Sequence, residues 1–317
     1  MKIRKRSVIL TCVILISGII VTWVASEPGG IKGFLFKQAL PLAYFEPHRT
    51  AAEFEQVSKN IYAFRFGFNR GLIVDTEEGL AVFDTFNRDF AAALKEQIQE
   101  SFPGKQVRWV FYSHHHLDHV GGAATLEPQE IVGHKDINSS FDDWPRADSF
   151  LRVTMPLQGD TEMLLGSTKL KLLYMPRSHS TTLYAFHFPE QDVVYAPDMM
   201  FVKAMPPFGF PDWYYPGYIR ALDRIIALNA SHYVPSHFSR GSRADLIAYR
   251  EMMVDFRNTV TQALARYEFD AASGTNLRAV FEEVYPELRD RYGDWHGFDA
   301  MFIPHFGGQA GGAYLGF

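Results

Sequence analysis

The chain has 317 residues, of which 47% are hydrophobic and 21% charged, a balance that excludes a largely disordered protein. Its net charge is −5 although its N-terminus is basic, so the rest of the chain is more acidic still and nucleic acid is not an expected partner. The single cysteine, Cys12, lies in an apolar N-terminal run, which excludes a disulfide framework and leaves nitrogen and oxygen as metal ligands in the folded body.

The N-terminus, residues 1–26, has the pattern of a membrane signal-anchor. The uncharged apolar stretch Val8 to Ala25 follows a basic cluster made of Lys2, Arg4, Lys5 and Arg6. At about 1.5 Å per residue this stretch approaches the ~30 Å hydrocarbon core of a bilayer. The basic flank is expected to stay in the cytoplasm, so the rest of the chain is predicted to lie outside it, periplasmic or extracellular. The alternative is a signal peptide cleaved near Val24-Ala25-Ser26, which gives a secreted protein.

A connector, rich in Gly and Pro at its start, is predicted over residues 27–58. Three strands are expected after it, over residues 61–68, 71–75 and 80–85. A helix is predicted from Asn87 to just before Pro103, because Phe90, Leu94 and Ile98 recur every four residues.

The apolar run Val107 to Tyr112 is predicted to be a strand buried on both faces. A strand, a helix and a buried strand in this order imply a crossover with a parallel pair. Ligand sites in such sheets lie beyond the carboxyl ends of the strands. The sequence Ser-His-His-His-Leu-Asp-His-Val-Gly-Gly, residues 113–122, begins at that point.

The second half of the chain predicts another β-rich lobe, so the main domain is expected over residues 59–240. Residues 241–317 are predicted to form a C-terminal helical extension, with helices over 243–269 and 277–292. The strands expected in the second lobe are 169–175, 182–188, 193–196 and 232–235, with a helix over 217–228 before the last of them.

The histidine cluster predicts two neighbouring metal positions. In an extended loop, residues two apart point the same way, so His114 and His116 converge on one ion while His115 faces elsewhere. Asp118 and His119 then serve a second position. Gly121 and Gly122 are expected to allow a tight turn through backbone angles that other residues avoid.

The pattern H-x-H-x-D-H followed by x-G-G resembles the signature of the metallo-β-lactamase superfamily. This resemblance implies an α/β fold, an αββα sandwich, with a dinuclear metal site at one edge. It also implies a later histidine, a bridging aspartate and a last histidine, which match His179, Asp198 and His237 in this chain. Asp84 matches the aspartate at a strand end beside the metal loop. Family members often have glycine before the third and last histidines, where this chain has Ser178 and Ser236.

The resemblance assigns seven ligands to two divalent ions. His114, His116 and His179 would hold the first ion, Asp118, His119 and His237 the second, and Asp198 would span both. Histidine and carboxylate ligands favour zinc, and iron and manganese accept the same set. The rival ligands His187 and His232 lie within or at the start of strands and are expected to be structural.

The ligand set predicts a metal-dependent hydrolase. Two ions about 3.5 to 4 Å apart share a water and lower its pKa, so that hydroxide forms near neutral pH. Asp118 is the predicted catalytic residue, and the scissile bond is expected to be ester-like, a lactone or related. The full ligand set resembles glyoxalase-II-type thioesterases, lactonases and related esterases. The alternatives are an iron-dependent redox enzyme on the same fold and a β-lactam hydrolase.

The expected substrate is a small molecule, and one feature suggests that it is hydrophobic. The aromatic stretch Met205 to Tyr218 predicts either an apolar wall over the metals or a loop that packs on the domain. Lys203 is expected to be solvated rather than bound to an anionic substrate. His305, between Pro304 and Gly307-Gly308, is expected to lie in a loop that packs or faces solvent, the alternative being a loop that approaches the site.

Overall fold

A computed structural model describes residues 52–142, 144, 149–207, 213–267 and 275–316. All of them belong to one compact unit that begins at His48. Over these ranges no helix has both the length and the apolar character needed to cross a bilayer. The N-terminal apolar run, which includes Cys12, lies outside the described residues, so the signal-anchor stays a prediction.

The first sheet has seven strands in sequential order. The three pairs from β1 to β4 are antiparallel, and the three pairs from β4 to β7 are parallel. The parallel pair of β4 and β5 with the intervening helix confirms the predicted crossover. The strands are β1 (Ala52–Ser58), β2 (Ile61–Phe66), β3 (Asn69–Thr76), β4 (Gly79–Phe83), β5 (Val107–Phe111), β6 (Glu130–His134) and β7 (Met155–Leu157).

The second sheet has five strands in the order β12-β11-β10-β9-β8. Only β11 and β12 form a parallel pair. The strands are β8 (Thr161–Leu165), β9 (Thr168–Tyr174), β10 (Tyr184–Phe188), β11 (Val193–Tyr195) and β12 (His232–Val234).

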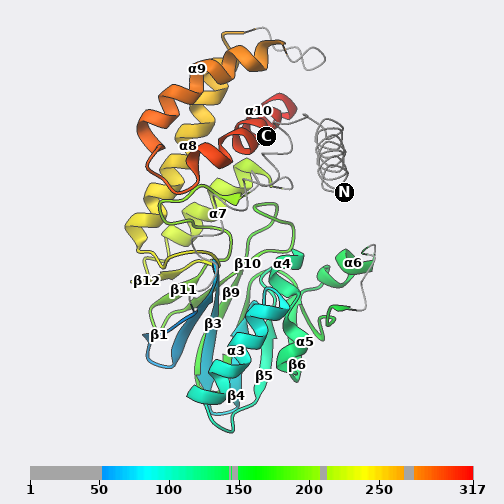
Figure 1. Ribbon diagram of the computed structural model, residues 1–317. Helices are drawn as coiled ribbons and strands as arrows, with labels where there is room; N and C mark the ends of the chain where they lie inside the picture. The colour runs from blue at the N-terminus through cyan, green and yellow to red at the C-terminus, as the bar shows by residue number, and fades with distance from the viewer. Residues whose placement is uncertain (1–51, 143, 145–148, 208–212, 268–274, 317) are drawn as a thin grey trace, which may run out of the picture. The chain divides into compact units, whose positions relative to one another are not determined.

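Side chains of the first sheet alternate between two apolar cores. Ile73 and Val82 face one core together with Phe90 of helix α3 (Arg88–Ser101). Leu72 and Phe83 face the other core, which they share with the second sheet. This alternation follows from the period of two along a strand. It places a helix layer outside the first sheet and packs the two sheets face to face (Figure 1).

Helix α3 forms for the reasons that the sequence indicates. The Asn87 side chain accepts a hydrogen bond from the backbone N–H of Phe90 and caps the first turn. Phe90, Leu94 and Ile98 are buried on one face, as predicted. Short helices follow the crossover, namely α4 (Leu117–Val120), α5 (Ala123–Leu126) and α6 (Ile137–Asp142).

The C-terminal extension is helical, as expected. Helix α8 (Arg243–Leu264) begins with a capping box between Ser242 and Asp245. Helices α9 (Thr275–Tyr292) and α10 (Phe298–Leu315) complete it, and α7 (Tyr215–Ile226) lies before β12. Figure 1 shows α8, α9 and α10 packed together beyond the end of the sheets that carries α4.

Three expectations about the elements are wrong. Strand β1 lies inside the segment predicted as a connector, and it pairs with β2. Strands β6, β7 and β8 were not predicted, because β6 is a short run without alternation and the side chains of β7 and β8 are mostly half-buried or exposed. The expected loop around His305 is part of α10, which continues through Pro304 and the glycines.

Candidate metal centre

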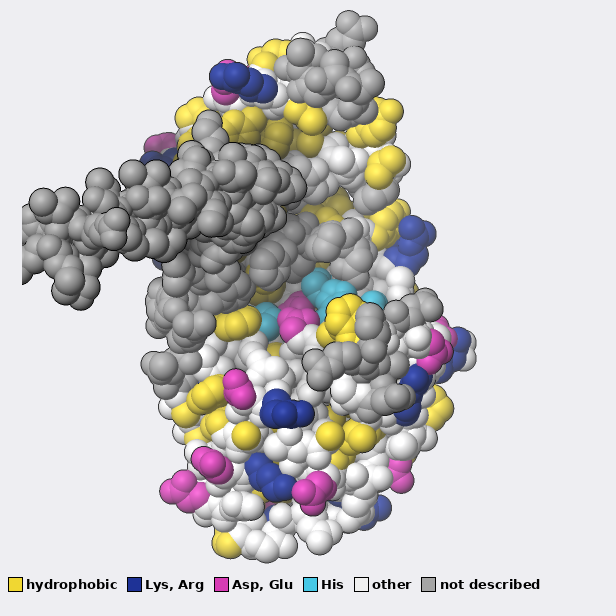
Figure 2. Space-filling view, turned by 45° about the vertical axis from the view of Figure 1, so that its right-hand side comes forward, with side chains coloured by type: hydrophobic (Ala, Val, Ile, Leu, Met, Phe, Trp, Pro, Cys, Tyr) yellow, Lys and Arg dark blue, Asp and Glu magenta, His cyan; other side chains and the backbone are white. Residues whose placement is uncertain are grey.

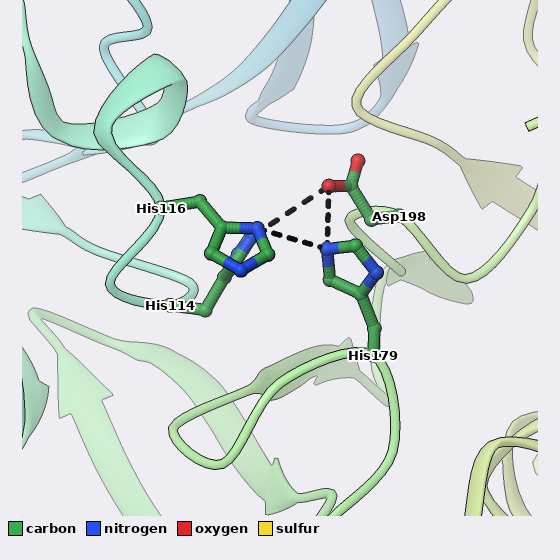
Figure 3. Close-up of side chains that lie close together, drawn as sticks. All are labelled: His114, His116, His179 and Asp198. Atoms are coloured by element: carbon green, nitrogen blue, oxygen red, sulfur yellow. Dashed lines mark hydrogen bonds and ion pairs between the residues drawn. The ribbon is translucent and has the colours of Figure 1, made fainter. Parts of the chain in front are cut away.

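The first ligand group is His114, His116, His179 and Asp198, whose ligand atoms lie within 4.8 Å of one another. His114 and His116 come from the bend after β5, and His116 is the N-cap of α4. His179 and Asp198 follow β9 and β11. Figure 3 shows the four side chains pointing toward one another from these separate segments. The distance between His179 Nε2 and His116 Nδ1 is 3.1 Å.

The second ligand group is Asp118, His119 and His237, also within 4.8 Å of one another. His119 and His237 are buried, whereas the side chain of Asp118 is 65% exposed. The distance between Asp118 Oδ2 and His119 Nε2 is 3.8 Å. Figure 2 shows histidine and acidic side chains gathered in the middle of one face of the molecule. Asp118 is therefore the ligand candidate that water and substrate reach most easily.

Asp198 connects the two groups. Its Oδ2 lies 3.0 Å from His179 Nε2 and 3.2 Å from His119 Nε2. Its Oδ1 lies 3.0 Å from His237 Nε2 and accepts a hydrogen bond of 2.5 Å from the Ser236 hydroxyl. Each carboxylate oxygen thus faces a different part of the cluster. Asp198 also has a φ of +54°, a left-handed conformation that is uncommon for a residue with a side chain.

Asp84 fixes the orientation of two candidate ligands from behind. Its Oδ2 accepts from the Ser113 hydroxyl at 2.8 Å and faces His119 Nδ1 at 3.0 Å. Since the Ser113 hydrogen points to Asp84, the Ser113 oxygen accepts from His114 Nδ1, 2.8 Å away. Both rings then carry their hydrogen on Nδ1 and turn an Nε2 lone pair toward the cluster.

The inward-facing nitrogens indicate a cation site. Among the described residues, the buried Nε2 atoms of His114 and His119 have no hydrogen-bond partner. A buried polar atom without a partner costs about 1 to 3 kcal/mol, so it requires an explanation such as an ion. A divalent ion bound by neutral imidazole and carboxylate satisfies these atoms, and the residues therefore fit the metals that the sequence implies.

The electrostatics of the cluster support the same assignment. Burial opposes a charge on Asp198, but His119, His237 and His179 hold the pKa of this carboxyl well below its usual range. Burial, and then the neighbouring His119 and His116, lower the pKa of His114 well below its usual value. Burial also opposes protonation of His119, but Asp198, Asp118 and Asp84 raise its pKa well above the usual value. The carboxylates around His119 therefore favour positive charge, whereas His114 stays neutral and keeps a lone pair for a ligand bond.

Gly121 and Gly122 are needed for space and not for unusual backbone angles, which corrects the sequence-based expectation. Their φ values are −69° and −101°, which other residues adopt readily. A Cβ on Gly122 would lie 2.6 Å from the carbonyl oxygen of Asn87 and would collide with that of Thr85. The metal loop therefore packs directly against the backbone that follows β4.

Aromatic rings enclose His237. The Phe68 ring stacks on it with centroids 5.2 Å apart, and the Phe201 ring lies at 5.9 Å with an angle of 18° between the planes. Phe86 lies at 6.0 Å from His237 and 5.1 Å from His119. The second ligand group is thus lined by apolar surface on several sides.

The described part of the aromatic stretch packs beside His179. The Tyr214 backbone N–H donates to the Ser178 carbonyl at 2.8 Å, and the Arg177 guanidinium lies over the Tyr214 ring at 4.6 Å. Gly217 is required here, because a Cβ would collide with the Arg177 carbonyl. Lys203 is exposed, as expected.

The structure places the other histidines outside the two groups. His115 Nδ1 lies 2.9 Å from the Thr182 hydroxyl, away from the cluster as predicted. The remaining histidines of the described ranges belong to neither group, namely His134, His187, His232, His296 and His305. Sequence reasoning missed Ser113, Tyr195 and Ser236 as hydrogen-bond partners of Asp84 and Asp198. Their only signal was their place next to the candidate ligands or at a strand end.

Comparisons with known proteins agree with this geometry. The family model of the metallo-β-lactamase superfamily matches residues 67–237, which is more than half of the chain. The chain is 29% identical over 258 residues to the 2,4-dinitroanisole O-demethylase subunit alpha of Nocardioides sp., covering 78% of this chain and 74% of that protein. It is 24% identical to subunit beta, covering 80% and 78%. A solved metallo-β-lactamase from Pontibacter korlensis superposes with a TM-score of 0.55 at 18% identity, covering 65% of this chain and all of that one.

Proposed function

The chain belongs to the metallo-β-lactamase superfamily, and we propose that it is a hydrolase that uses two divalent metal ions to cleave an ester-like, lactone or related bond in a hydrophobic small molecule. Members of this superfamily are mostly metal-dependent enzymes. The observation that carries the proposal is the position of Asp198, whose two oxygens face His179 and His237 in different ligand groups. Zinc is the proposed metal, and iron or manganese would accept the same ligands.

When bound, such ions polarise a carbonyl oxygen and bring the pKa of water close to neutral. Asp118 is positioned to take the proton of the attacking water, because its carboxylate is exposed beside His119. Asp84 and Ser113 keep His114 and His119 in the tautomer that binds a cation. The rings around His237 offer apolar surface for the substrate and exclude bulk water.

A second candidate reaction is cleavage of an activated aryl ether. It is favoured by similarity over more than three quarters of the chain to two proteins named as subunits of 2,4-dinitroanisole O-demethylase. In the hydrolytic form of this reaction, the oxygen of water bonds to the ring carbon and the bond to methoxide breaks. The products are 2,4-dinitrophenol and methanol, so no oxidant is needed. The alternatives of β-lactam hydrolysis and of iron-dependent redox chemistry are decided by the same screen.

The test is a turnover screen of the zinc-loaded full chain over esters, lactones, thioesters, sulfate esters, phosphodiesters, β-lactams and 2,4-dinitroanisole. The matched control is Asp118→Asn, which keeps the size of the side chain. Turnover by the parent that falls about 10²-fold in the variant supports the proposal. Equal rates for the parent, the variant and a chelated sample contradict it. Dominant iron with oxygen uptake favours the redox alternative.

We also propose that the catalytic unit lies outside the cytoplasm, held at the membrane by residues 8–25 or secreted after cleavage near Ala25. The basic flank and the uncharged run support this proposal. A reporter fused after Phe317 is expected to be active only outside the cytoplasm. Activity confined to the cytoplasm would contradict it.

A further inference from the structure

The segment Asp198–Pro206 links the candidate bridging ligand to the aromatic stretch. It runs between β11 and α7 and lies mostly buried. Residues of the C-terminal extension hold it at its start, middle and end. Each of these attachments is a hydrogen bond or a short chain of hydrogen bonds, and none involves a ligand candidate from the metal loop.

The start of the segment is held through two buried tyrosines. The Tyr218 hydroxyl donates to the backbone carbonyl of Asp198 at 3.0 Å, and it lies 2.9 Å from the Tyr249 hydroxyl on α8. Because Tyr218 uses its hydrogen on Asp198, Tyr249 donates to Tyr218. Both tyrosines are fully buried. A relay of this kind restrains the left-handed backbone at Asp198, a conformation that is unfavourable for a residue with a side chain.

The middle of the segment pairs with the turn before α10. The backbone N–H of His296 donates to the Lys203 carbonyl at 2.8 Å, and the Met205 N–H donates to the His296 carbonyl at 3.0 Å. These two bonds form a short parallel bridge. The segment therefore has a backbone partner about a hundred residues further along the chain.

The end of the segment is held by a buried histidine of α10. His305 Nε2 lies 2.8 Å from the Pro206 carbonyl, and the residue is 2% exposed. A carbonyl oxygen can only accept, so His305 donates the hydrogen. Burial lowers the pKa of His305 to about 4, so the ring is neutral at neutral pH and its Nε2 carries the hydrogen.

We infer that the C-terminal extension helps to position the metal site. Tyr249 and His305 are the positioning residues, one for each end of the segment Asp198–Pro206. Tyr249 acts through Tyr218 on the backbone of Asp198, the candidate bridging ligand. His305 acts on the entry to the aromatic stretch. Between these ends, Phe201 packs against both Tyr249, at 5.8 Å, and His237, at 5.9 Å, so the extension also contacts the ring of a ligand candidate through one intermediate side chain.

If the extension only stabilised the fold, variants within it would behave differently in the tests below. If α8 to α10 only added stability, any loss of packing within them would act on the site in proportion to its effect on folding. Val284, fully buried on α9, provides this control. Val284→Ala is expected to lower the melting temperature without changing the segment or the metal affinity.

The first arm of the test measures amide hydrogen exchange over residues 199–205 in the full, zinc-loaded chain. His305→Phe keeps an aromatic ring but removes the donor, and is expected to speed exchange about 10-fold. His305→Gln places an amide N–H at a similar reach and is expected to restore slow exchange. Unchanged exchange in His305→Phe, or equal acceleration in Val284→Ala, would overturn the inference.

The second arm measures zinc affinity by competition with a chelator. Tyr249→Phe removes the hydroxyl that supports Tyr218 and is expected to weaken binding about 5-fold, since outer hydrogen-bond partners tune metal sites. His305→Phe is expected to leave zinc affinity within about 2-fold of the parent, because Pro206 lies well along the segment from Asp198. If Tyr249→Phe binds zinc as tightly as the parent does, Tyr249 is not a positioning residue.

A third arm rests on the proposed function and uses 4-nitrophenyl acetate as the probe. His305→Phe is expected to raise KM several-fold with little change in kcat, because it loosens the end of the segment Asp198–Pro206 and not the ligands. A fall in kcat at constant KM would contradict this role. If the parent chain does not turn over the probe, the proposed function fails on that ester while the exchange and affinity arms still decide the inference.

Discussion

Two parts of the chain carry the same local pattern, a histidine, an apolar residue and two glycines. One is His119-Val120-Gly121-Gly122 in the metal loop, and the other is His305-Phe306-Gly307-Gly308 in α10. In the first, His119 faces the second ligand group, and a Cβ on either glycine would press against backbone carbonyls. In the second, His305 donates to Pro206 within an apolar core, and a Cβ on Gly307 would meet nothing within 4 Å.

The difference shows that the pattern takes its role from its surroundings. His119 lies among Asp84, Asp118 and Asp198, so its environment favours positive charge. His305 lies 6.1 Å from the Phe256 ring and donates to a backbone carbonyl, and its environment favours the neutral form. The same residue type can therefore bind a cation in one region and act as a structural donor in the other.

The largest expected effect is at the glycines. Gly122→Ala forces backbone carbonyls of Thr85 and Asn87 to move, so we expect it to lower the free energy of unfolding by about 3 kcal/mol and to impair metal binding. Gly307→Ala is the matched control, and it should raise stability by up to ~1 kcal/mol because alanine favours a helix and the site is open. Chemical denaturation of both variants measures these changes. Similar destabilisation by the two substitutions would show that the metal loop needs glycine no more than α10 does.

The next largest effect distinguishes two residues of the metal loop, the ligand candidate Asp118 and His115, which points away from the cluster. Asp118→Asn removes the charge beside His119, and we expect a loss of about 10²-fold in turnover with the fold and the first-group metal retained. His115→Ala removes a ring bonded to Thr182 and should cost less than about 10-fold. Turnover, metal content and melting temperature are measured together. Equal losses in turnover, at unchanged stability, would show that the alternation of side chains along the loop was misassigned.

A smaller effect concerns acid stability and the histidine of α10. The pKa of His305 is lowered to about 4 in the folded chain, against 6.5 for an ordinary histidine. The stabilisation from its neutral form is fully present above pH 6.5 and is lost as the pH falls toward 4, because the unfolded chain takes up the proton first. At pH 5 this loss is about 2 kcal/mol.

His305→Gln tests this effect, because glutamine does not titrate. The decrease in the free energy of unfolding between pH 7.5 and pH 5 should be about 2 kcal/mol smaller in the variant than in the parent. Denaturant titrations at the two pH values give the comparison. The same decrease in both proteins would mean that folding does not lower the pKa of His305.

The sequence predicted the features that depend on short stretches. The crossover from β4 to β5 follows from a four-residue apolar period in α3 and a strand that is apolar apart from Arg108. The placement of His114, His116 and His119 follows from the spacing within one loop, and the later ligands came from the resemblance. Asp84 also came from the resemblance, as the aspartate at a strand end beside the metal loop.

Other features depend on contacts between distant residues and have no local signal. The hydrogen bonds from Tyr218 to Asp198 and from His305 to Pro206 join residues 20 and 99 positions apart. Helix α10 contains Pro304 and two glycine pairs, so its intrinsic preference is poor and packing against α8 and α9 must compensate. The charged strand β1 is stabilised by pairing with β2, including the ion pair of Glu53 and Arg65, which only the fold brings together.

The central claim is that the described cluster holds two metal ions, and the metal content of the purified full chain tests it most directly. After zinc supplementation and removal of free metal, the parent is expected to hold about two zinc ions per chain, and so is His305→Gln. His119→Gln removes a ligand of the second group and should hold about one. A parent content that stays below one, or a His119→Gln content equal to that of the parent, would contradict the two-metal assignment.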